Sequence, residues 1–129
     1  MPVIAIEKNP FYELVVSTEK NRVYLKIIGF WRNGATVPNY LQDWQKALDL
    51  VKQGFTLLTD ASRMIIHPAD VRSLHEQAQT MILKAGVSKV AEILTDRTSE
   101  IQLDNVAKVT SFPKKNFTSP EDAERWLDG

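Results

Sequence analysis

The segment from Gly54 to Gly86 constrains the fold most strongly, because it joins a short strand pattern directly to a long helix pattern. Residues 55–60, Phe-Thr-Leu-Leu-Thr-Asp, predict a short buried strand. An Asp-Ala-Ser turn follows, and apolar residues then recur at three- and four-residue steps from about Pro68 to Ala85. This arrangement is typical of open α/β sheets, which place binding groups at the carboxyl ends of strands and beside helix N-termini.

The residues on both sides of this segment carry further strand and helix patterns. Apolar and polar residues alternate in 12–17 and again in 22–30, and the polar turn between them predicts an antiparallel hairpin. The other predicted elements are a short edge strand at 3–6, a helix from about Pro38 to Val51, a strand at 89–94, a weak helix around 103–107, a strand at 116–118 and a last helix after Ser119. Because helices separate most of these strands, the order predicts a mixed, mostly parallel sheet with an N-terminal antiparallel hairpin.

Composition narrows the classes of protein to which the chain can belong. Its 129 residues predict a single domain over 1–129. The 16 basic residues balance 16 acidic ones, so the basic excess typical of nucleic-acid binders is missing. Cysteine is absent, which excludes disulfides, thiolate metal sites and cysteine nucleophiles. The start of the chain does not read as a signal sequence, and no apolar run reaches about 18 residues, so we expect a cytoplasmic protein without membrane insertion.

Three parts of the sequence resemble one known family. They are Gly29 at the end of the second hairpin strand, the Leu-Leu-Thr-Asp-Ala-Ser turn at 57–62, and the closing segment FTSPEDAERWL at 117–127. Together with the element order, they resemble the STAS domain superfamily, and most closely its small stand-alone bacterial SpoIIAA-like proteins. Chains of that group often end on a Phe-x-x-x-x-x-Ala-x-x-Trp-Leu pattern. The residues that match this pattern here are Phe117, Ala123, Trp126 and Leu127.

The resemblance implies an α/β SpoIIAA-like (STAS) fold, with a mixed sheet and helices packed mainly on one face. It also implies a regulatory module without catalytic residues or a cofactor, because STAS domains generally act by binding a partner and not as enzymes. Within such a fold we expect Trp126 to be buried and to anchor the last helix.

The chain departs from the family at the regulatory switch. STAS domains that antagonise anti-sigma factors are phosphorylated on a serine at the start of a helix, after an Asp-x-Ser sequence that Asp60 and Ser62 match. Residues 67–70, His-Pro-Ala-Asp, stand where that serine would lie, and none carries a hydroxyl. The sequence therefore predicts no phosphoswitch. Asp70 has two interpretations: it mimics a phosphorylated residue, or it is an ordinary acidic residue at a helix start.

We predict that a protein partner binds to the loop between the strand at 55–60 and the helix at 68–85, and a second copy of the chain is one candidate for this partner. The run Met64-Ile65-Ile66 and the pair Phe30-Trp31 predict an apolar rim with at least one exposed side chain among the loop residues. The predicted site residues are Asp60, Ser62, Arg63, Ile65, His67 and Asp70. The alternative is a carrier or sensor of a small apolar, lipid-like ligand that enters near Ile65 and Ile66, as a distant kinship with the Sec14-type fold implies.

Two residue combinations resemble catalytic or metal sites, but neither is complete. Asp60, Ser62 and His67 are the residue types of a nucleophilic triad, yet so short a tether rarely places the histidine between the other two. The sequence from His75 to Gln79 resembles the zinc motif HExxH, but a glutamine stands in place of the second histidine. We therefore predict no metal site and expect His75 to face solvent.

A third combination resembles the acceptor site of a phosphoryl receiver domain. Asp60 ends one predicted strand, Thr95 follows the next, and Lys114 or Lys115 lies further along the chain. A receiver also needs an acidic pair for Mg²⁺ after its first strand and begins with a βαβ unit. This chain begins with a hairpin and has no such pair, so receiver activity is not expected.

Overall fold

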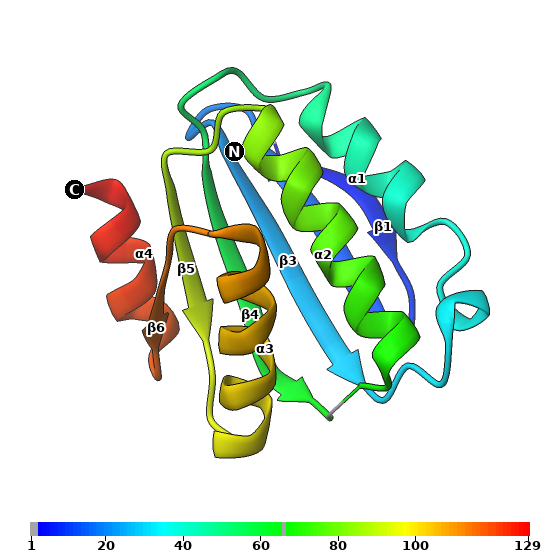
Figure 1. Ribbon diagram of the computed structural model, residues 1–129. Helices are drawn as coiled ribbons and strands as arrows, with labels where there is room; N and C mark the ends of the chain where they lie inside the picture. Colours follow the sequence, from blue (N-terminus) through cyan, green and yellow to red (C-terminus); the bar gives the residue numbers. More distant parts are fainter. Residues whose placement is uncertain (1–2, 66) are drawn as a thin grey trace.

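The computed structural model describes residues 3–65 and 67–129, and Figure 1 shows how their helices and strands are arranged. In chain order the elements are β1 (Val3–Lys8), β2 (Tyr12–Ser17), β3 (Arg22–Gly29), the 3₁₀ turn η1 (Gly34–Thr36), α1 (Tyr40–Leu48), β4 (Thr56–Met64), α2 (Ala69–Lys84), β5 (Lys89–Ile93), α3 (Arg97–Thr110), β6 (Lys114–Phe117) and α4 (Pro120–Asp128). Every predicted element is present. The weak helix around 103–107 is a full helix because the Asp96 side chain caps it, accepting a hydrogen bond from Ser99 N at 3.0 Å.

The strands form one six-stranded sheet in which their spatial order equals their order along the chain. β1 pairs with β2 and β2 with β3 in antiparallel orientation, whereas β3, β4, β5 and β6 are successively parallel. The expected edge strand is therefore real, and it extends to Lys8. The sheet is mixed, with an N-terminal antiparallel hairpin, as the sequence predicts.

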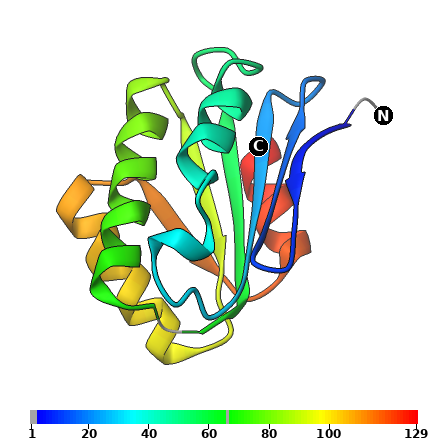
Figure 2. The same cartoon turned by 90° about the vertical axis from the view of Figure 1, so that its right-hand side faces the viewer.

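The connections determine which face of the sheet each helix covers. α1, α2 and α3 each join one parallel strand to its immediate neighbour, and all three steps run in the same direction across the sheet. Because such crossovers are almost always right-handed, three equal steps place the three helices on the same face. Figures 1 and 2 show this layer, with α4 alone on the opposite face. The prediction of helices mainly on one face is confirmed.

The main core lies between the sheet and the layer of α1, α2 and α3. Its largest fully buried side chains are Trp31, Trp44, Tyr12, Tyr40 and Phe55. Tyr12 also carries a polar group into this core, and its hydroxyl donates a hydrogen bond to Asp43 Oδ2 at 2.5 Å. Burial and the Asp43 carboxylate raise the pKa of Tyr12 above its usual value, so the phenol remains protonated and serves as the donor that the buried carboxylate needs.

A smaller core lies under α4 on the opposite face. It consists of five buried residues, Leu58, Ala91, Ile93, Ala123 and Leu127. Ser119 caps the helix by accepting a hydrogen bond from Asp122 N, with Pro120 in the first turn, as the sequence predicts.

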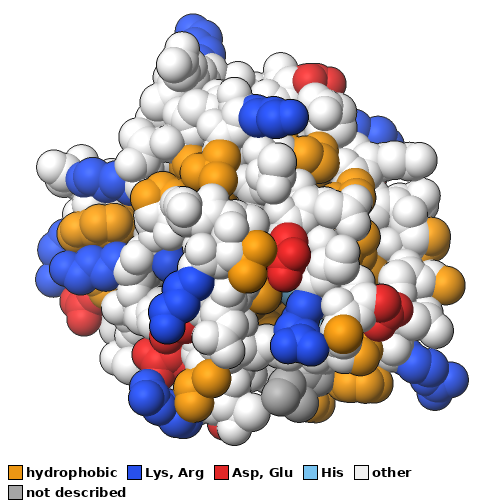
Figure 3. Space-filling view, in the orientation of Figure 1, with side chains coloured by type: hydrophobic (Ala, Val, Ile, Leu, Met, Phe, Trp, Pro, Cys, Tyr) orange, Lys and Arg blue, Asp and Glu red, His pale blue; other side chains and the backbone are white. Residues whose placement is uncertain are grey.

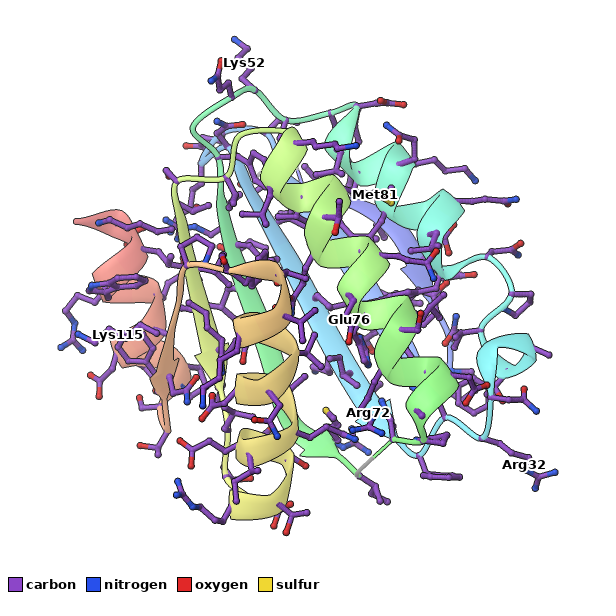
Figure 4. All side chains as sticks on the ribbon, in the orientation of Figure 1. Arg32, Lys52, Arg72, Glu76, Met81 and Lys115 are labelled. Carbon is purple, nitrogen blue, oxygen red and sulfur yellow. The ribbon has the colours of Figure 1, made fainter. Side chains whose placement is uncertain are left out.

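Trp126 is only partly buried, so the expectation that it is a buried anchor is wrong in degree. Its ring centroid lies 5.6 Å from that of Phe117, and the ammonium groups of Lys89 and Lys115 lie over the indole. The reason is the position of α4 beside β5 and β6 at the margin of the sheet, where one side of the indole meets lysine side chains instead of apolar core. Figure 4 shows Lys115 at this outer edge.

The outer surface of the helical layer carries basic, acidic and hydrophobic side chains interspersed with one another (Figure 3). This mixture agrees with the net charge of zero and forms no extended field of one sign. Among residues 3–65 and 67–129, no helix is long and apolar enough to cross a membrane.

Candidate functional site

The six residues predicted for the site lie along one stretch of chain but not on one surface. Asp60 is half-buried and lines a groove on the α4 side of the sheet, whereas His67 is buried on the helical side. Arg63, Ile65 and Asp70 are exposed. The structure therefore does not bring the six side chains together into one pocket.

The segment from Asp60 to Ser62 is a bulge within β4 and not the turn that the sequence predicts. Lys26 of β3 pairs with Asp60 and Ile28 pairs with Arg63, so β4 has one extra residue between these two pairs. Asp60 Oδ1 accepts hydrogen bonds from Ser62 N at 3.0 Å and from Ser62 Oγ at 2.6 Å. This bonding bends the chain locally, as in a turn. Pairing with β3 resumes afterwards, so the strand continues to Met64 instead of ending at residue 60.

The carboxyl ends of β3 and β4 present two exposed hydrophobic side chains, Phe30 and Ile65, which we call the exposed corner. Their exposed fractions are 47% and 55%. Ile65 N donates a hydrogen bond to the Gly29 carbonyl oxygen at 3.0 Å, so the two residues lie on adjacent chains. The neighbouring side chains of Trp31 and Met64 are buried. The expectation of at least one exposed side chain in the run Met64-Ile65-Ile66 is confirmed by Ile65, while Ile66 lies outside the described residues.

His67 and His75, the two histidines of the chain, form a hydrogen-bonded pair beneath the exposed corner. His67 Nδ1 lies 3.1 Å from His75 Nε2, and His67 Nε2 lies 3.2 Å from the Gly29 carbonyl oxygen. Because a carbonyl only accepts, His67 must carry a proton on Nε2, and His75 Nε2 must then donate to His67 Nδ1. Trp31 stacks on His67 with ring centroids 4.9 Å apart.

Burial lowers the pKa of both histidines. The pKa of His75 falls to about 3, mainly through desolvation and further through the adjacent His67 ring. Desolvation also lowers the pKa of His67, although its hydrogen bond to Gly29 opposes the change. Both rings are therefore neutral near pH 7, which the tautomer arrangement requires.

The expectation that His75 faces solvent is wrong. His75 is 4% exposed and lies on the buried face of α2 with Val71, Ala78 and Ile82, at steps of four, three and four residues. The same periodicity is present in the sequence, but a histidine is a polar residue type, and this favoured an exposed position over a core position. A histidine can occupy such a position because His67 supplies its hydrogen-bond partner.

Gln102 of α3 fixes the backbone of His67 and was not predicted from the sequence. Its Oε1 accepts a hydrogen bond from His67 N at 2.8 Å, and its Nε2 donates to the His67 carbonyl oxygen at 2.6 Å. The amide thereby satisfies both polar groups of a buried loop residue. One signal was available in the sequence: Gln102 precedes Leu103 on the apolar face of that helix, where a glutamine needs a polar partner.

The three residue types of a nucleophilic triad do not form one. The Ser62 hydroxyl donates to Asp60, whereas both ring nitrogens of His67 face Gly29 and His75. A triad needs the histidine between the hydroxyl and the carboxylate.

The receiver-like trio is not assembled either. The Thr95 hydroxyl donates to the Ser62 carbonyl oxygen at 3.2 Å, and the Lys114 ammonium contacts Glu92 and Asp104. In the part of the chain that the structure describes, no group of three or more His, Asp or Glu side chains is placed to hold a metal ion.

A groove of about 220 Å³ lies on the opposite side of the sheet, between α4 and the exposed parts of β2 and β3. Its floor includes Val15, Tyr24 and Leu58, and Asp60 and Glu124 lie on its wall. The groove lies beside α4, a nine-residue helix that packs mainly on β4 and β5 and reaches β3 through Glu124.

Comparison with solved structures gives the fold a precedent. The structure matches a crystal structure of an uncharacterized protein of the DUF3478 family from Shewanella loihica PV-4, described as having a SpoIIAA-like fold. The match has a TM-score of 0.67 and 15% identity, and it covers 94% of this chain and 97% of that one. The chain has a SpoIIAA-like fold. SiaC of Pseudomonas aeruginosa matches with a TM-score of 0.50 and 14% identity, over 91% of this chain and all of that one, 100%. No family model and no curated protein matches the sequence.

In this SpoIIAA-like structure, Pro68 is the N-cap residue of α2 and Asp70 lies in the first turn of the helix. Asp70 Oδ2 accepts a hydrogen bond from Gly34 N at 3.3 Å, which joins the loop containing η1 to the start of α2. The carboxylate also lies where the helix dipole favours negative charge. Asp70 thus has a structural role in the segment where the switch serine of the family would lie, and its role as a phosphate mimic stays a hypothesis.

Proposed function

We propose that this chain is a cytoplasmic, non-enzymatic STAS-like regulatory module that binds a protein partner through the β4–α2 region. The supporting observation is the exposed corner of Phe30 and Ile65, at the carboxyl ends of two adjacent strands. Exposed apolar side chains that cluster at one edge of a fold are a common feature of protein interfaces. The low-identity structural matches bear on the fold alone, so this proposal rests on the corner itself.

The support beneath the corner is rigid, which favours binding with little loss of conformational entropy. His67 bonds to the Gly29 carbonyl oxygen immediately before Phe30, and Gln102 holds the backbone of His67. The bulge at Asp60 sets the path of the chain toward Ile65. Arg32 projects from the same end of the molecule (Figure 4), and no described carboxylate pairs with it, so it offers a partner a free positive charge.

The proposed module works without phosphorylation at the start of α2, because residues 67–70 carry no hydroxyl. Ser62 is the nearest serine before the helix, and its hydroxyl is already bonded to Asp60. Ser73 lies within the helix and is exposed.

Site-specific photo-crosslinking in cells of the source organism tests the proposal. A benzophenone amino acid at position 65 should give one discrete adduct, and the same group at Thr18 should not, because Thr18 is exposed in the turn at the opposite end of the strands. An adduct with the mass of two chains would identify the partner as a second copy. No adduct at position 65, or the same adducts from both positions, would contradict the proposed site.

The alternative function, a carrier or sensor of a small apolar ligand, is favoured by the groove on the α4 side of the sheet. Its volume of about 220 Å³ and its Val15, Tyr24 and Leu58 floor suit a small apolar molecule. This location differs from the predicted entry, since Ile65 does not line the groove. Native mass spectrometry of freshly purified protein distinguishes the two functions: a retained small molecule supports the carrier, and the mass of the bare chain supports partner binding.

A further inference from the structure

A small cavity lies inside the main core, between the sheet and the helical layer. Its volume is about 30 Å³, which exceeds the roughly 10–15 Å³ that one water molecule needs on the same scale. Most of its wall is apolar, but polar side chains reach it from β4, α2 and β5 as well as Tyr40 and Trp44 of α1. Those from the two strands and α2 are Thr59, His75, Gln79 and Glu92.

Glu92 is a buried residue with a carboxylate oxygen that lacks a hydrogen-bond donor among the described residues. Its side chain is 2% exposed, and Lys114 Nζ lies 2.8 Å from its Oε1. The approach of this ammonium is not aligned for a hydrogen bond, so Oε1 has an ion-pair partner but no hydrogen-bond donor among the described residues. A buried carboxylate oxygen without a donor is costly. Trp44 Nε1, also on the cavity wall, is the other buried side-chain polar atom without a partner in this part of the chain.

Two further polar groups lie beside Glu92. Thr59 is its register partner on β4, and neighbouring strands are about 4.8 Å apart, so the two side chains lie next to each other on the same face. Gln79 of α2 is 6% exposed, and its Oε1 accepts a hydrogen bond from the Thr110 hydroxyl. That bond leaves the two amide protons of Gln79 Nε2 available as donors.

We infer that this cavity is a hydration site for one ordered water molecule, which donates to Glu92 Oε1 and is held by the Thr59 hydroxyl and the Gln79 amide. The cavity is too small for an organic ligand. A cation is disfavoured because Lys114 already balances the Glu92 carboxylate and in turn contacts Asp104 at 2.5 Å. A neutral molecule that both donates and accepts meets the requirements of all three groups.

The water completes a polar network that spans five elements of the fold, namely α2, β4, β5, β6 and α3. It joins α2 through Gln79 to β4 and β5 through Thr59 and Glu92, and Lys114 continues the network to α3 through Asp104. The inference is independent of the proposed partner binding, since no residue of the exposed corner lines the cavity.

A crystal structure of the full chain at about 1.5 Å resolution or better tests the inference directly. We expect an electron-density peak about 2.7–3.2 Å from Glu92 Oε1 and from at least one of Thr59 Oγ1 and Gln79 Nε2. Well-ordered walls around a cavity without a peak would overturn the site. It would also be overturned if the Lys114 ammonium proved to donate a well-aligned hydrogen bond to Oε1 with no peak beside it.

Nuclear Overhauser effects between water and backbone amides provide a second test in solution. The amide of Glu92 should show a water signal in the native chain, and Thr59→Val, which keeps the side-chain shape, should reduce it at least twofold. Thr80→Val is the matched control, because the Thr80 hydroxyl is exposed and donates only to the Glu76 carbonyl oxygen. An unchanged signal in a folded Thr59→Val variant would remove Thr59 from the site, and no signal in the native chain would remove the water.

Discussion

The two faces of the sheet are covered by different numbers of helices, and their stability depends on different interactions. The helical face has three helices over a core of large aromatic side chains, with polar groups buried among them and paired to one another. The opposite face has one nine-residue helix over a core of five residues, held at its margin by ion pairs. There the buried Arg22 contacts Glu124 and Asp128, both of which are partly exposed. Stability should therefore depend on packing and protonation at the helical face, and much less on the α4 face.

Truncating Trp31 should produce the largest effect, because this side chain is fully buried and contacts both histidines. We expect Trp31→Ala to lower the free energy of unfolding by about 3–5 kcal/mol, through the lost apolar contacts and the cavity left behind. Urea denaturation followed by circular dichroism measures the change. A loss below about 1 kcal/mol would mean that the aromatic cluster does not dominate the helical face.

Acid should destabilise the helical face through its histidine pair. The folded-state pKa of each histidine is lowered, to about 3 in His75, so the unfolded chain binds protons first as the pH falls below about 6.5. The histidine contribution to stability should therefore be constant above pH 6.5 and should fall below it, by about 1 kcal/mol per pH unit for His75. His67 should add a decrease of the same sign, because its pKa is also lowered.

The matched variant for this prediction is His75→Gln, whose amide can still donate to His67 Nδ1. It should lose the His75 share of the pH-dependent decrease between pH 6.5 and 5, about 1 kcal/mol per pH unit, as measured by urea denaturation at each pH. An identical slope in the native chain and the variant would show that His75 does not cause the acid sensitivity.

The difference between the two faces also explains how far sequence reasoning reached. Periodicity alone predicts the order of the strands and helices, because apolar steps of two and of three to four are local properties of the chain. The layer of helices on one face was implied by the resemblance to SpoIIAA-like proteins and not by periodicity. The buried His67–His75 pair and the hydrogen bonds from Gln102 to the His67 backbone could not be predicted in the same way. The bonded residues lie 8 and 35 positions apart in the chain, and a polar residue type usually indicates an exposed position.

The bulge in β4 shows a second limit of the sequence. Asp60 and Ser62 form the local hydrogen bonds that a turn would have, and these bonds are readable from the sequence. Whether pairing with β3 resumes after them depends on a strand more than 30 residues earlier in the chain. The sequence therefore predicts a site along one continuous loop, whereas Asp60 lies on the α4 side of the sheet and His67 is buried on the helical side.

Removing the indole of Trp126 should have a moderate effect, in contrast to Trp31. The side chain is partly buried and packs against Phe117 at the sheet margin, under the ammonium groups of two lysines. We expect Trp126→Ala to cost about 1–2 kcal/mol in the free energy of unfolding. Urea denaturation of the two tryptophan variants side by side measures the ratio. A Trp126→Ala loss equal to that of Trp31→Ala would show that α4 belongs to the same cooperative core as the helical face.

The smallest effect on stability should come from the exposed corner, where two adjacent residues form a natural control pair. Ile65 is 55% exposed and Met64 is 4% exposed. Ile65→Ser should change the free energy of unfolding by less than about 0.5 kcal/mol, because an exposed side chain has little apolar contact to lose. Met64→Ser should cost about 2–4 kcal/mol, since it removes a buried side chain and adds a hydroxyl to the core. Thermal unfolding of both variants measures the difference. A strongly destabilised Ile65→Ser protein would mean that Ile65 is held in the structure for packing, and the exposed corner would lose its support as a binding surface.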